Sequence, residues 1–308
     1  MNRVRPSLII LAAGASSRMK KSLEALNSQS SSAQLIEEKN KDGLPHSLTH
    51  KGLIVLDQHG QTAIDLLIDQ AIQAGITRVV MVIQPPGDAF IKHFKINSSK
   101  IGAVENNTSS DFKNINIDFA FQKIPEGRVK PMGTADALQQ CIEQFPELNH
   151  QEFIVCNADN LYSRAAFRAL IDSTSENALI GYDRDGLDFP LEKIRSFALL
   201  TTNSQGFMTD LIEKPDEEAV QKLMNQGQQL NVSMNLWKFK GSDLWNALLS
   251  CPVHLERQEK ELPTAVRQMI SQSQIKVLVI PRREHVPDLT QASDIQAVRL
   301  LLSQGKSR

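Results

Sequence analysis

Short apolar runs alternate with segments of helical periodicity over the first half of the chain. Residues 79–83 form an unbroken apolar run, as expected of a strand buried on both faces of a sheet. Residues 62–74 carry apolar side chains three or four positions apart and are followed by Gly75, which predicts a helix. Repetition of strand and helix is typical of a mostly parallel sheet with helices on both faces.

The same reading extends along the whole sequence. Strands are predicted at residues 8–11, 51–56, 79–83, 117–121, 153–156, 178–182, 197–202, 207–212, 232–239 and 275–280. Helices are predicted at residues 62–74, 136–145, 163–172, 217–224, 263–270 and 291–302. We therefore expect one Rossmann-like α/β domain over residues 1–308, with a mostly parallel mixed sheet. A small C-terminal α+β subdomain is expected from about residue 241.

Residues 22–50 break this pattern. They are rich in serine, asparagine and charged residues and lack the apolar content of a core. We expect a surface insertion, and the sequence leaves open whether it tunes substrate size or has no role.

The stretch around which the chain is organised is residues 7–21, SLIILAAGASSRMKK. It reads as a buried strand that runs into a turn of small residues and opens a helix. Small side chains let backbone N–H groups approach an anion, and a helix N-terminus adds a positive dipole end. The two best-known phosphate motifs, G-x-G-x-x-G and G-x-x-x-x-G-K-[ST], are absent. Similar turns also occur without a ligand, so this pattern alone leaves phosphate binding open.

Composition narrows the class of protein. The 308 residues include 34 basic and 35 acidic side chains, a net charge of −1, with 41% hydrophobic and 5% aromatic residues. Such a balance favours neither a nucleic-acid partner nor a membrane surface. Three widely spaced cysteines and seven scattered histidines indicate no disulfide framework and no zinc site. We expect a cytoplasmic protein, because cleavage of the N-terminus as a signal peptide would remove the small-residue turn.

Three groups of polar residues are candidates for chemistry. Asp159 follows a buried strand, at the edge where open α/β sheets bind ligands, but it could equally cap the next helix. Asp288 would complete an all-oxygen Mg²⁺ site if it lay beside Asp159, and is otherwise a loop residue. Glu213 and Lys214 could grip a sugar hydroxyl and a phosphate, or could form a surface turn.

No nucleophile and base pair stands out in the sequence. A phosphate monoester needs neither, because it already carries close to two negative charges at neutral pH. Its attack on phosphorus requires alignment of two anions and cancellation of their repulsion. Backbone amides, a few basic side chains and Mg²⁺ would suffice.

The motif LAAGASSRM resembles the opening signature of the sugar-phosphate nucleotidyltransferase family, and further likenesses follow in the family's order over nearly the whole chain. The resemblance implies a nucleotide-diphospho-sugar transferase fold. Lys51 corresponds to the family's next lysine, displaced by the insertion and without the usual proline after it. Nucleotide contacts are implied at Leu11, Ala12, Ala13, Gly14, Ser17, Arg18, Gln122, Gly133 and Thr134.

The remaining motifs concern the metal and the sugar. The run 157–160, NADN, resembles the family's N-G-D-N with alanine in place of glycine, which implies that Asp159 is the first Mg²⁺ ligand. Asp288 stands in a segment that resembles W-x-D-x-G-T without its tryptophan and glycine, and would be the second ligand. Glu213 and Lys214 match the sugar-binding E-K-P, while Asn235 is a weaker candidate because its strand lacks the family's small-residue step.

These likenesses imply a Mg²⁺-dependent enzyme that joins a nucleoside triphosphate to a sugar 1-phosphate. Its predicted catalytic residues are Arg18, Lys51 and Asp159. The alternatives are transfer to a non-sugar phosphate such as phosphocholine or to a cofactor, a non-catalytic nucleotide-sugar-binding protein, and a glycosyltransferase on a related sheet. No nucleic-acid or membrane partner is expected. The sequence fixes neither base nor sugar, and it leaves open whether the chain forms a homo-oligomer.

Overall fold

The computed structural model describes residues 4–14, 19, 21–22, 50–87, 89–94, 115–227 and 229–304. Ser17 and Arg18, and all but the two ends of the predicted insertion at 22–50, lie outside these residues. The expectations for them stay predictions, as does the subdomain boundary near residue 241.

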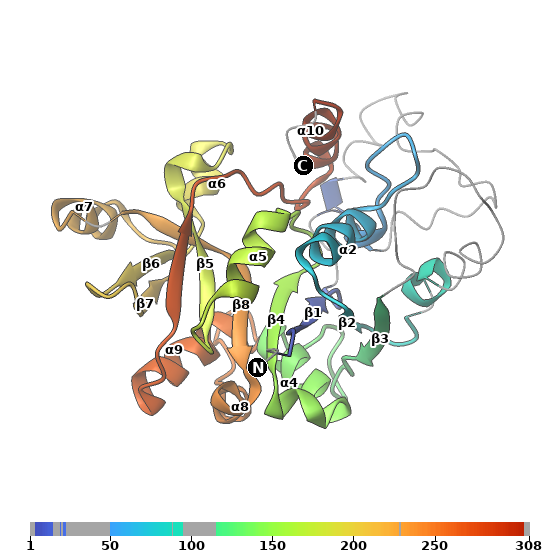
Figure 1. Cartoon of the computed structure of the whole chain (residues 1–308), viewed down its shortest axis with the longest axis horizontal. Helices are drawn as coiled ribbons and strands as arrows, with labels where there is room; N and C mark the ends of the chain where they lie inside the picture. The colour runs from blue at the N-terminus through green and yellow to red at the C-terminus, as the bar shows by residue number, and fades with distance from the viewer. Residues whose placement is uncertain are drawn as a thin grey trace.

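The described residues contain a mixed sheet of nine strands, which confirms the predicted α/β fold (Figure 1). Its main path runs in the order β3 (Asn116–Phe121), β2 (Arg78–Ile83), β1 (Ser7–Leu11), β4 (Glu152–Asn157), β8 (Asn231–Lys240), β5 (Ala178–Asp183) and β9 (Leu278–Arg282). The first four strands are parallel, whereas β8 runs antiparallel to both of its neighbours. The hairpin of β6 (Leu199–Thr202) and β7 (Met208–Ile212) attaches to β8.

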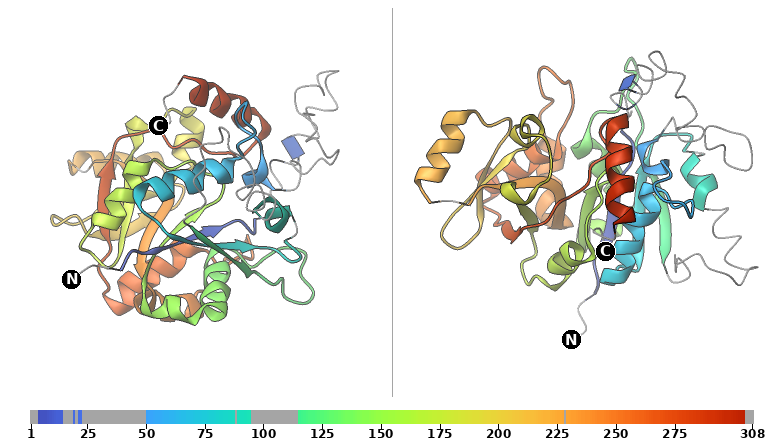
Figure 2. Two further views of the ribbon diagram at one scale, coloured as in Figure 1. Left: turned by 45° about the vertical axis from the view of Figure 1, so that its right-hand side comes forward. Right: turned by 90° about the horizontal axis from the view of Figure 1, so that it is seen from above.

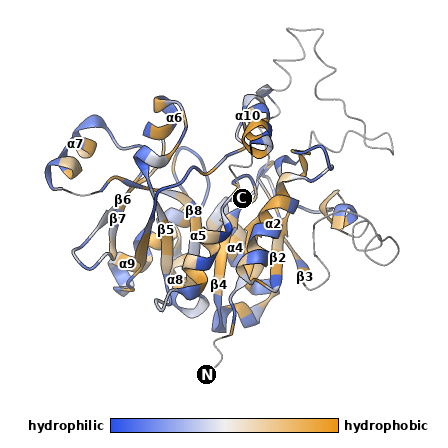
Figure 3. Cartoon of the chain, turned by 45° about the horizontal axis from the view of Figure 1, so that its top comes forward, coloured by the Kyte–Doolittle hydropathy of each residue, from blue (hydrophilic) through white to orange (hydrophobic). Residues whose placement is uncertain are grey.

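Alternation of side chains along the central strands builds the two faces of the sheet. In β1, Leu8 and Ile10 join a cluster with α2 (Ala63–Ala74) and α5 (Arg164–Asp172), while Ile9 joins the opposite cluster. That second cluster includes α4 (Thr134–Gln144), α8 (Gly241–Ser250) and α9 (Leu262–Ser273). Figure 3 shows that the central strands are apolar and that the helices carry both apolar and polar positions. Burial on both faces makes these strands continuously apolar.

Local signals fix the ends of the predicted helices. α2 begins with a capping box in which the Thr62 hydroxyl accepts from Asp65 N–H and the Asp65 carboxylate accepts from Thr62 N–H. It ends at Gly75, whose φ of 105° requires the left-handed region that glycine tolerates. α5 is capped by Ser163, so the alternative interpretation of Asp159 as its cap is wrong.

Two predicted strands are wrong in place or type. Residues 51–56 contain a 3-10 turn at Lys51–Leu53 and a single β-bridge between Val55 and Thr62. Their apolar side chains pack in the clusters under α2 and α10 (Ala292–Ser303) and do not enter the main sheet. The last strand lies at Leu278–Arg282, three residues later than its predicted start, because its register is set by pairing with β5.

Two helices that the hydrophobic pattern does not single out complete the fold. α6 (Leu191–Arg195) is a short helix between β5 and β6, and α8 follows β8 directly. α6, α7 (Glu217–Asn225) and the β6–β7 hairpin lie together at the end of the molecule remote from β3 (Figure 2). Among the described helices, none is both long and apolar enough to span a membrane.

Candidate active site

A cavity of about 280 Å³ opens at the carboxyl ends of the parallel strands. β2 and β3 extend the sheet on one side of β1, whereas β4 extends it on the other. Successive strands after β1 are thus added on one side of it, and the chain then crosses to the other side to form β4. Open α/β sheets bind ligands at the point between two such strands, here β1 and β4. The cavity lies there, between the segments that follow these two strands.

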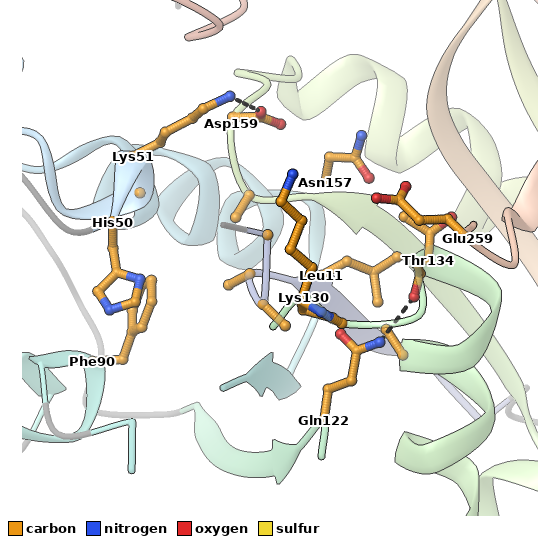
Figure 4. A pocket seen from close by; sticks show the side chains of 18 residues that line it. Leu11, His50, Lys51, Phe90, Gln122, Lys130, Thr134, Asn157, Asp159 and Glu259 are labelled. Atoms are coloured by element: carbon orange, nitrogen blue, oxygen red, sulfur yellow. Dashed lines mark hydrogen bonds and ion pairs between the residues drawn. The ribbon is translucent and has the colours of Figure 1, made fainter. Parts of the chain in front are cut away.

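Most of the residues predicted to bind nucleotide line this cavity (Figure 4). They are Leu11, Ala12, Ala13, Gly14, Gln122, Gly133 and Thr134. Two residues predicted to be catalytic, Lys51 and Asp159, line the cavity as well. Four residues predicted to bind the metal or the sugar do not line it: Glu213, Lys214, Asn235 and Asp288.

The segment after β1 presents backbone amides to the cavity. Ala12 N–H donates to Val82 O at 2.8 Å, which fixes the start of the turn. Within the described part of the chain, the N–H groups of Ala13 and Gly14 donate to no protein acceptor. A Cβ added at Gly14 would meet no atom within 4 Å, so the space above this backbone is open. Two free amides on an open turn are suited to an anionic oxygen.

The carboxamide of Gln122 is held in one orientation at the floor of the cavity (Figure 4). Its Nε2 donates to Gly133 O at 3.0 Å and to Asp136 Oδ2 at 2.7 Å. Gln140 also donates to that Asp136 oxygen, as expected of a carboxylate. Because both partners of Nε2 can only accept, Oε1 is left as the acceptor of Gln122. It is suited to an N–H group of a base edge.

The loop at residues 251–261 forms the wall beside Gly133. Ala135 N–H donates to Lys260 O at 3.0 Å, and Leu262 N–H donates to Thr134 Oγ1 at 2.9 Å. Thr134 Oγ1, predicted with Gly133 to lie against base and ribose, thus accepts one hydrogen bond from the protein and keeps its own O–H as a donor. A Cβ at Gly133 would lie 2.5 Å from Lys260 O, which explains why this contact needs glycine.

Asp159 and Lys51 form an ion pair at the opposite end of the cavity, with Nζ 3.0 Å from Oδ2 (Figure 4). Burial raises the pKa of the Asp159 carboxyl above its ordinary value, and the negative charge of Asp288 adds to the rise. Lys51 opposes it, because an adjacent cation favours the ionised carboxylate. A carboxylate destabilised by burial gains most when a further cation binds.

The fold brings the Asp288 segment beside the Asp159 segment, 129 residues earlier. Asn160 and Asp288 form an antiparallel β-bridge, and Leu289 N–H donates to Asp159 O at 2.8 Å. The Asp288 carboxylate accepts from Thr290 Oγ1 and lies 3.1 Å from Lys193 Nζ. The backbones of the two segments are therefore adjacent, and each carboxylate has a lysine partner.

The donor set fits a hard cation that takes part of its shell from elsewhere. Among the described residues, no group of three or more His, Cys, Asp or Glu side chains could hold a metal alone. Mg²⁺ usually takes one or two carboxylates and fills its octahedron with water and substrate phosphates. Asp159, which lines the cavity, offers one such carboxylate, and Asp288, which does not line it, lies on the adjoining segment.

The predicted sugar-binding residues lie on β7 and β8. Glu213 follows β7 and accepts from Arg257 Nη2 at 3.1 Å, which connects it to the loop at residues 251–261. Lys214 and Asn235 have φ angles of 45° and 59°. Left-handed backbone at non-glycine residues is uncommon and gathers at functional sites. The pairing of Val155 with Trp237 sets Asn235 near the end of β4, beside the cavity.

Nine lining residues were not predicted as site residues, among them Asn157, His50, Phe90 and Glu259. Asn157 stands two positions before Asp159, and its place at the end of β4 could have identified it. His50 and Phe90 are in ring contact, with centroids 4.9 Å apart, across segments 40 residues apart. Glu259 reaches the cavity from the loop packed on Gly133. No motif marks the last three, because they depend on how the loops pack.

Comparison with protein families gives one match over most of the chain. A family model described as nucleotidyl transferase matches residues 42–284. The match contains Lys51, Gln122, Asp159 and Glu213, and begins after the β1 turn. It also ends before Asp288.

A solved structure has the same fold over its full length. The crystal structure of a UDP-glucose pyrophosphorylase complexed with UDP-glucose superposes with a TM-score of 0.65 and 13% sequence identity. The alignment covers 98% of the present chain and 100% of the other. At this identity the similarity concerns the fold.

Proposed function

The chain belongs to the nucleotidyl transferase family, and we propose that it joins a nucleoside triphosphate to a sugar 1-phosphate, releasing pyrophosphate and a nucleotide-activated sugar. One observation carries the proposal: amide donors, the oriented carboxamide of Gln122 and a half-buried carboxylate–lysine pair surround one cavity at the switch point of the sheet. The cavity thus offers partners for a base, for phosphates and for a cation.

The nucleotide is proposed to lie along the cavity between Gln122 and Lys51. Gln122 Oε1 accepts from the base, with Gly133 and Thr134 beside the base and ribose. The amides of Ala13 and Gly14, next to Leu11 and Ala12, donate to phosphate oxygens. Ser17, Arg18 and Lys51 complete the phosphate contacts, with Arg18 and Lys51 steadying the leaving pyrophosphate.

Asp159 and Asp288 are proposed to hold Mg²⁺. When bound, the ion would cancel charge between the two anionic substrates and orient the triphosphate. The acceptor phosphate attacks the α-phosphorus in line and needs no protein base, because it is already ionised near neutral pH. Glu213, Lys214 and Asn235 orient the sugar. The protein's contribution is alignment and electrostatic screening.

Pyrophosphate release with a matrix of substrates tests the proposal. The common nucleoside triphosphates are combined, with Mg²⁺, with a panel of sugar 1-phosphates and with phosphocholine. We expect release that requires both a triphosphate and a sugar 1-phosphate. Release with phosphocholine alone would instead assign a non-sugar acceptor. A triphosphate that raises the melting temperature without any release would assign a binding protein.

A substitution at Gly14 can test nucleotide binding without changing the stability of the fold. Its Cβ would meet no atom within 4 Å, so Gly14→Ala is expected to leave the melting temperature unchanged. The same methyl group would stand where a phosphate oxygen approaches the amides. We expect triphosphate affinity, measured by calorimetry, to fall about tenfold, or about 1.4 kcal/mol of binding free energy. Unchanged affinity would remove the turn after β1 from the phosphate site.

A further inference from the structure

Lys193, on α6, forms ion pairs with two aspartates in and next to the Asp288 segment. Its Nζ lies 3.1 Å from Asp288 Oδ2 and 3.7 Å from Asp294 Oδ2. The ammonium group also lies 4.3 Å from the centre of the Phe189 ring, a favourable cation–π position. The lysine, Asp288 and Asp294 side chains are all largely buried. The charge of this ammonium group is therefore stabilised mainly by protein groups and less by bulk water.

The same kind of carboxylate–lysine ion pair is present at the other proposed metal ligand, Asp159. Lys51 opposes Asp159, and Lys193 opposes Asp288, so both proposed metal ligands face an ammonium group. A divalent ion bound by Asp288 would stand close to Lys193. Like charges repel strongly at such range in a partly buried site. The ion and the ammonium group therefore compete for the same carboxylate.

α6 itself contributes little apolar packing that would oppose release of this contact. The helix has five residues and buries none of them, so little apolar packing holds it in place. Lys193 is its ionic link to the segment that carries Asp288. The same connection leads into β6 and β7 and so to Glu213. Release of Lys193 would loosen α6, which lies at the same end of the molecule as the β6–β7 hairpin (Figure 1).

We propose that Lys193 is a positioning residue. In the metal-free protein its ammonium group occupies the place of a cation beside the Asp288 carboxylate, and it leaves that place when a divalent ion binds. The inference rests on the proposed metal role of Asp288. It couples metal binding to the segment that leads through β6 and β7 to Glu213, because the displaced side chain belongs to α6. The opposite possibility is a fixed support, in which Lys193 keeps Asp288 in its binding orientation.

Affinity for Mn²⁺ separates the two roles without any measurement of activity. Free Mn²⁺ is titrated into the full chain and followed by its electron paramagnetic resonance signal. Lys193→Met removes the charge that lies over the Phe189 ring and keeps an unbranched side chain of similar length. We expect it to bind Mn²⁺ about tenfold more tightly than the unaltered protein, because one repelling charge is gone. Lys193→Arg keeps the charge and should bind like the unaltered protein.

Asp288→Asn provides the reference for the metal site itself. If this variant loses Mn²⁺ while Lys193→Met binds equally or more weakly than the unaltered protein, the displaced-lysine role is wrong and the metal site stands. If Asp288→Asn binds Mn²⁺ as well as the unaltered protein, Asp288 is no ligand, and both the inference and the proposed metal role fail. A folded Lys193→Arg variant shows that position 193 tolerates substitution.

Discussion

Replacing Asp159 with asparagine is expected to lower the rate of pyrophosphate release by about 10²-fold to 10³-fold, the usual cost of removing one electrostatic group from an active site. Asparagine has the shape of aspartate and keeps the bridge between the two segments, since that bridge uses backbone atoms. What is lost is the negative charge that would hold Mg²⁺ and face Lys51. The loss should appear in kcat, measured with saturating substrates.

The same substitution is not expected to destabilise the fold. The pKa of Asp159 is raised in the folded protein, chiefly by burial, so the native state holds this proton more tightly than the unfolded chain. As pH rises above the ordinary pKa of about 4, ionisation of Asp159 costs the unaltered protein stability. The asparagine variant has no such cost. In metal-free buffer its relative stability should therefore increase through that pH window and then level off.

Asp172→Asn is a matched control. Asp172 lies at the end of α5 in an exposed pair with Arg168, away from the cavity. Its loss should leave kcat unchanged. A normal rate for Asp159→Asn would contradict the metal assignment, and a collapse of its melting temperature would mean that Asp159 has a structural role.

Gly133→Ala is expected to cause the largest loss of stability among single substitutions in the cavity wall. The φ and ψ angles of Gly133, 103° and −173°, lie in a region open essentially to glycine alone. The new Cβ would also meet Lys260 O at 2.5 Å, a backbone atom that cannot rotate away. Together these effects should cost about 3 kcal/mol or more of unfolding free energy, measured by chemical denaturation.

Binding should suffer as well. Gly133 O accepts from Gln122, which is proposed to read the base, and the residues on either side of Gly133, Met132 and Ala135, are hydrogen-bonded to Lys260 of the loop at residues 251–261. Displacement of that loop should abolish the thermal shift produced by the preferred triphosphate. Gly127→Ala is the control: Gly127 also has positive φ, 78°, but a Cβ there meets nothing within 4 Å. It should cost only about 1–2 kcal/mol and leave binding intact. Equal effects of the two substitutions would refute the role of the Lys260 contact.

Local pattern was enough to predict the parallel half of the sheet. β1 and β2 are buried on both faces and read as apolar runs, and α2 is bounded by a capping residue and a glycine. Residues 51–56 defeat this reasoning, because an apolar run that packs beneath helices has the same composition as a strand. The place of β9 depends on its partner β5, which its own sequence does not encode.

The candidate site divides in the same way. Gly14, Gln122 and Asp159 follow strand ends, and the carboxyl ends of parallel strands meet at one edge, so their convergence could be predicted. Glu259 and Lys193 come from a loop and a short helix whose positions depend on tertiary packing. Nothing in their local sequence marks them. Electrostatic partners of this kind become visible only when distant segments are placed side by side.

The central claim is that Asp159 and Asp288 share one divalent ion beside the turn that carries Gly14. Crystals grown with Mn²⁺ and the preferred triphosphate, measured at the manganese absorption edge, test it directly by anomalous scattering. We predict a peak within direct coordination distance, about 2.1 Å, of an oxygen of each carboxylate and of the triphosphate. A nucleotide bound in the cavity with the peak elsewhere, or in contact with neither aspartate, would contradict the account.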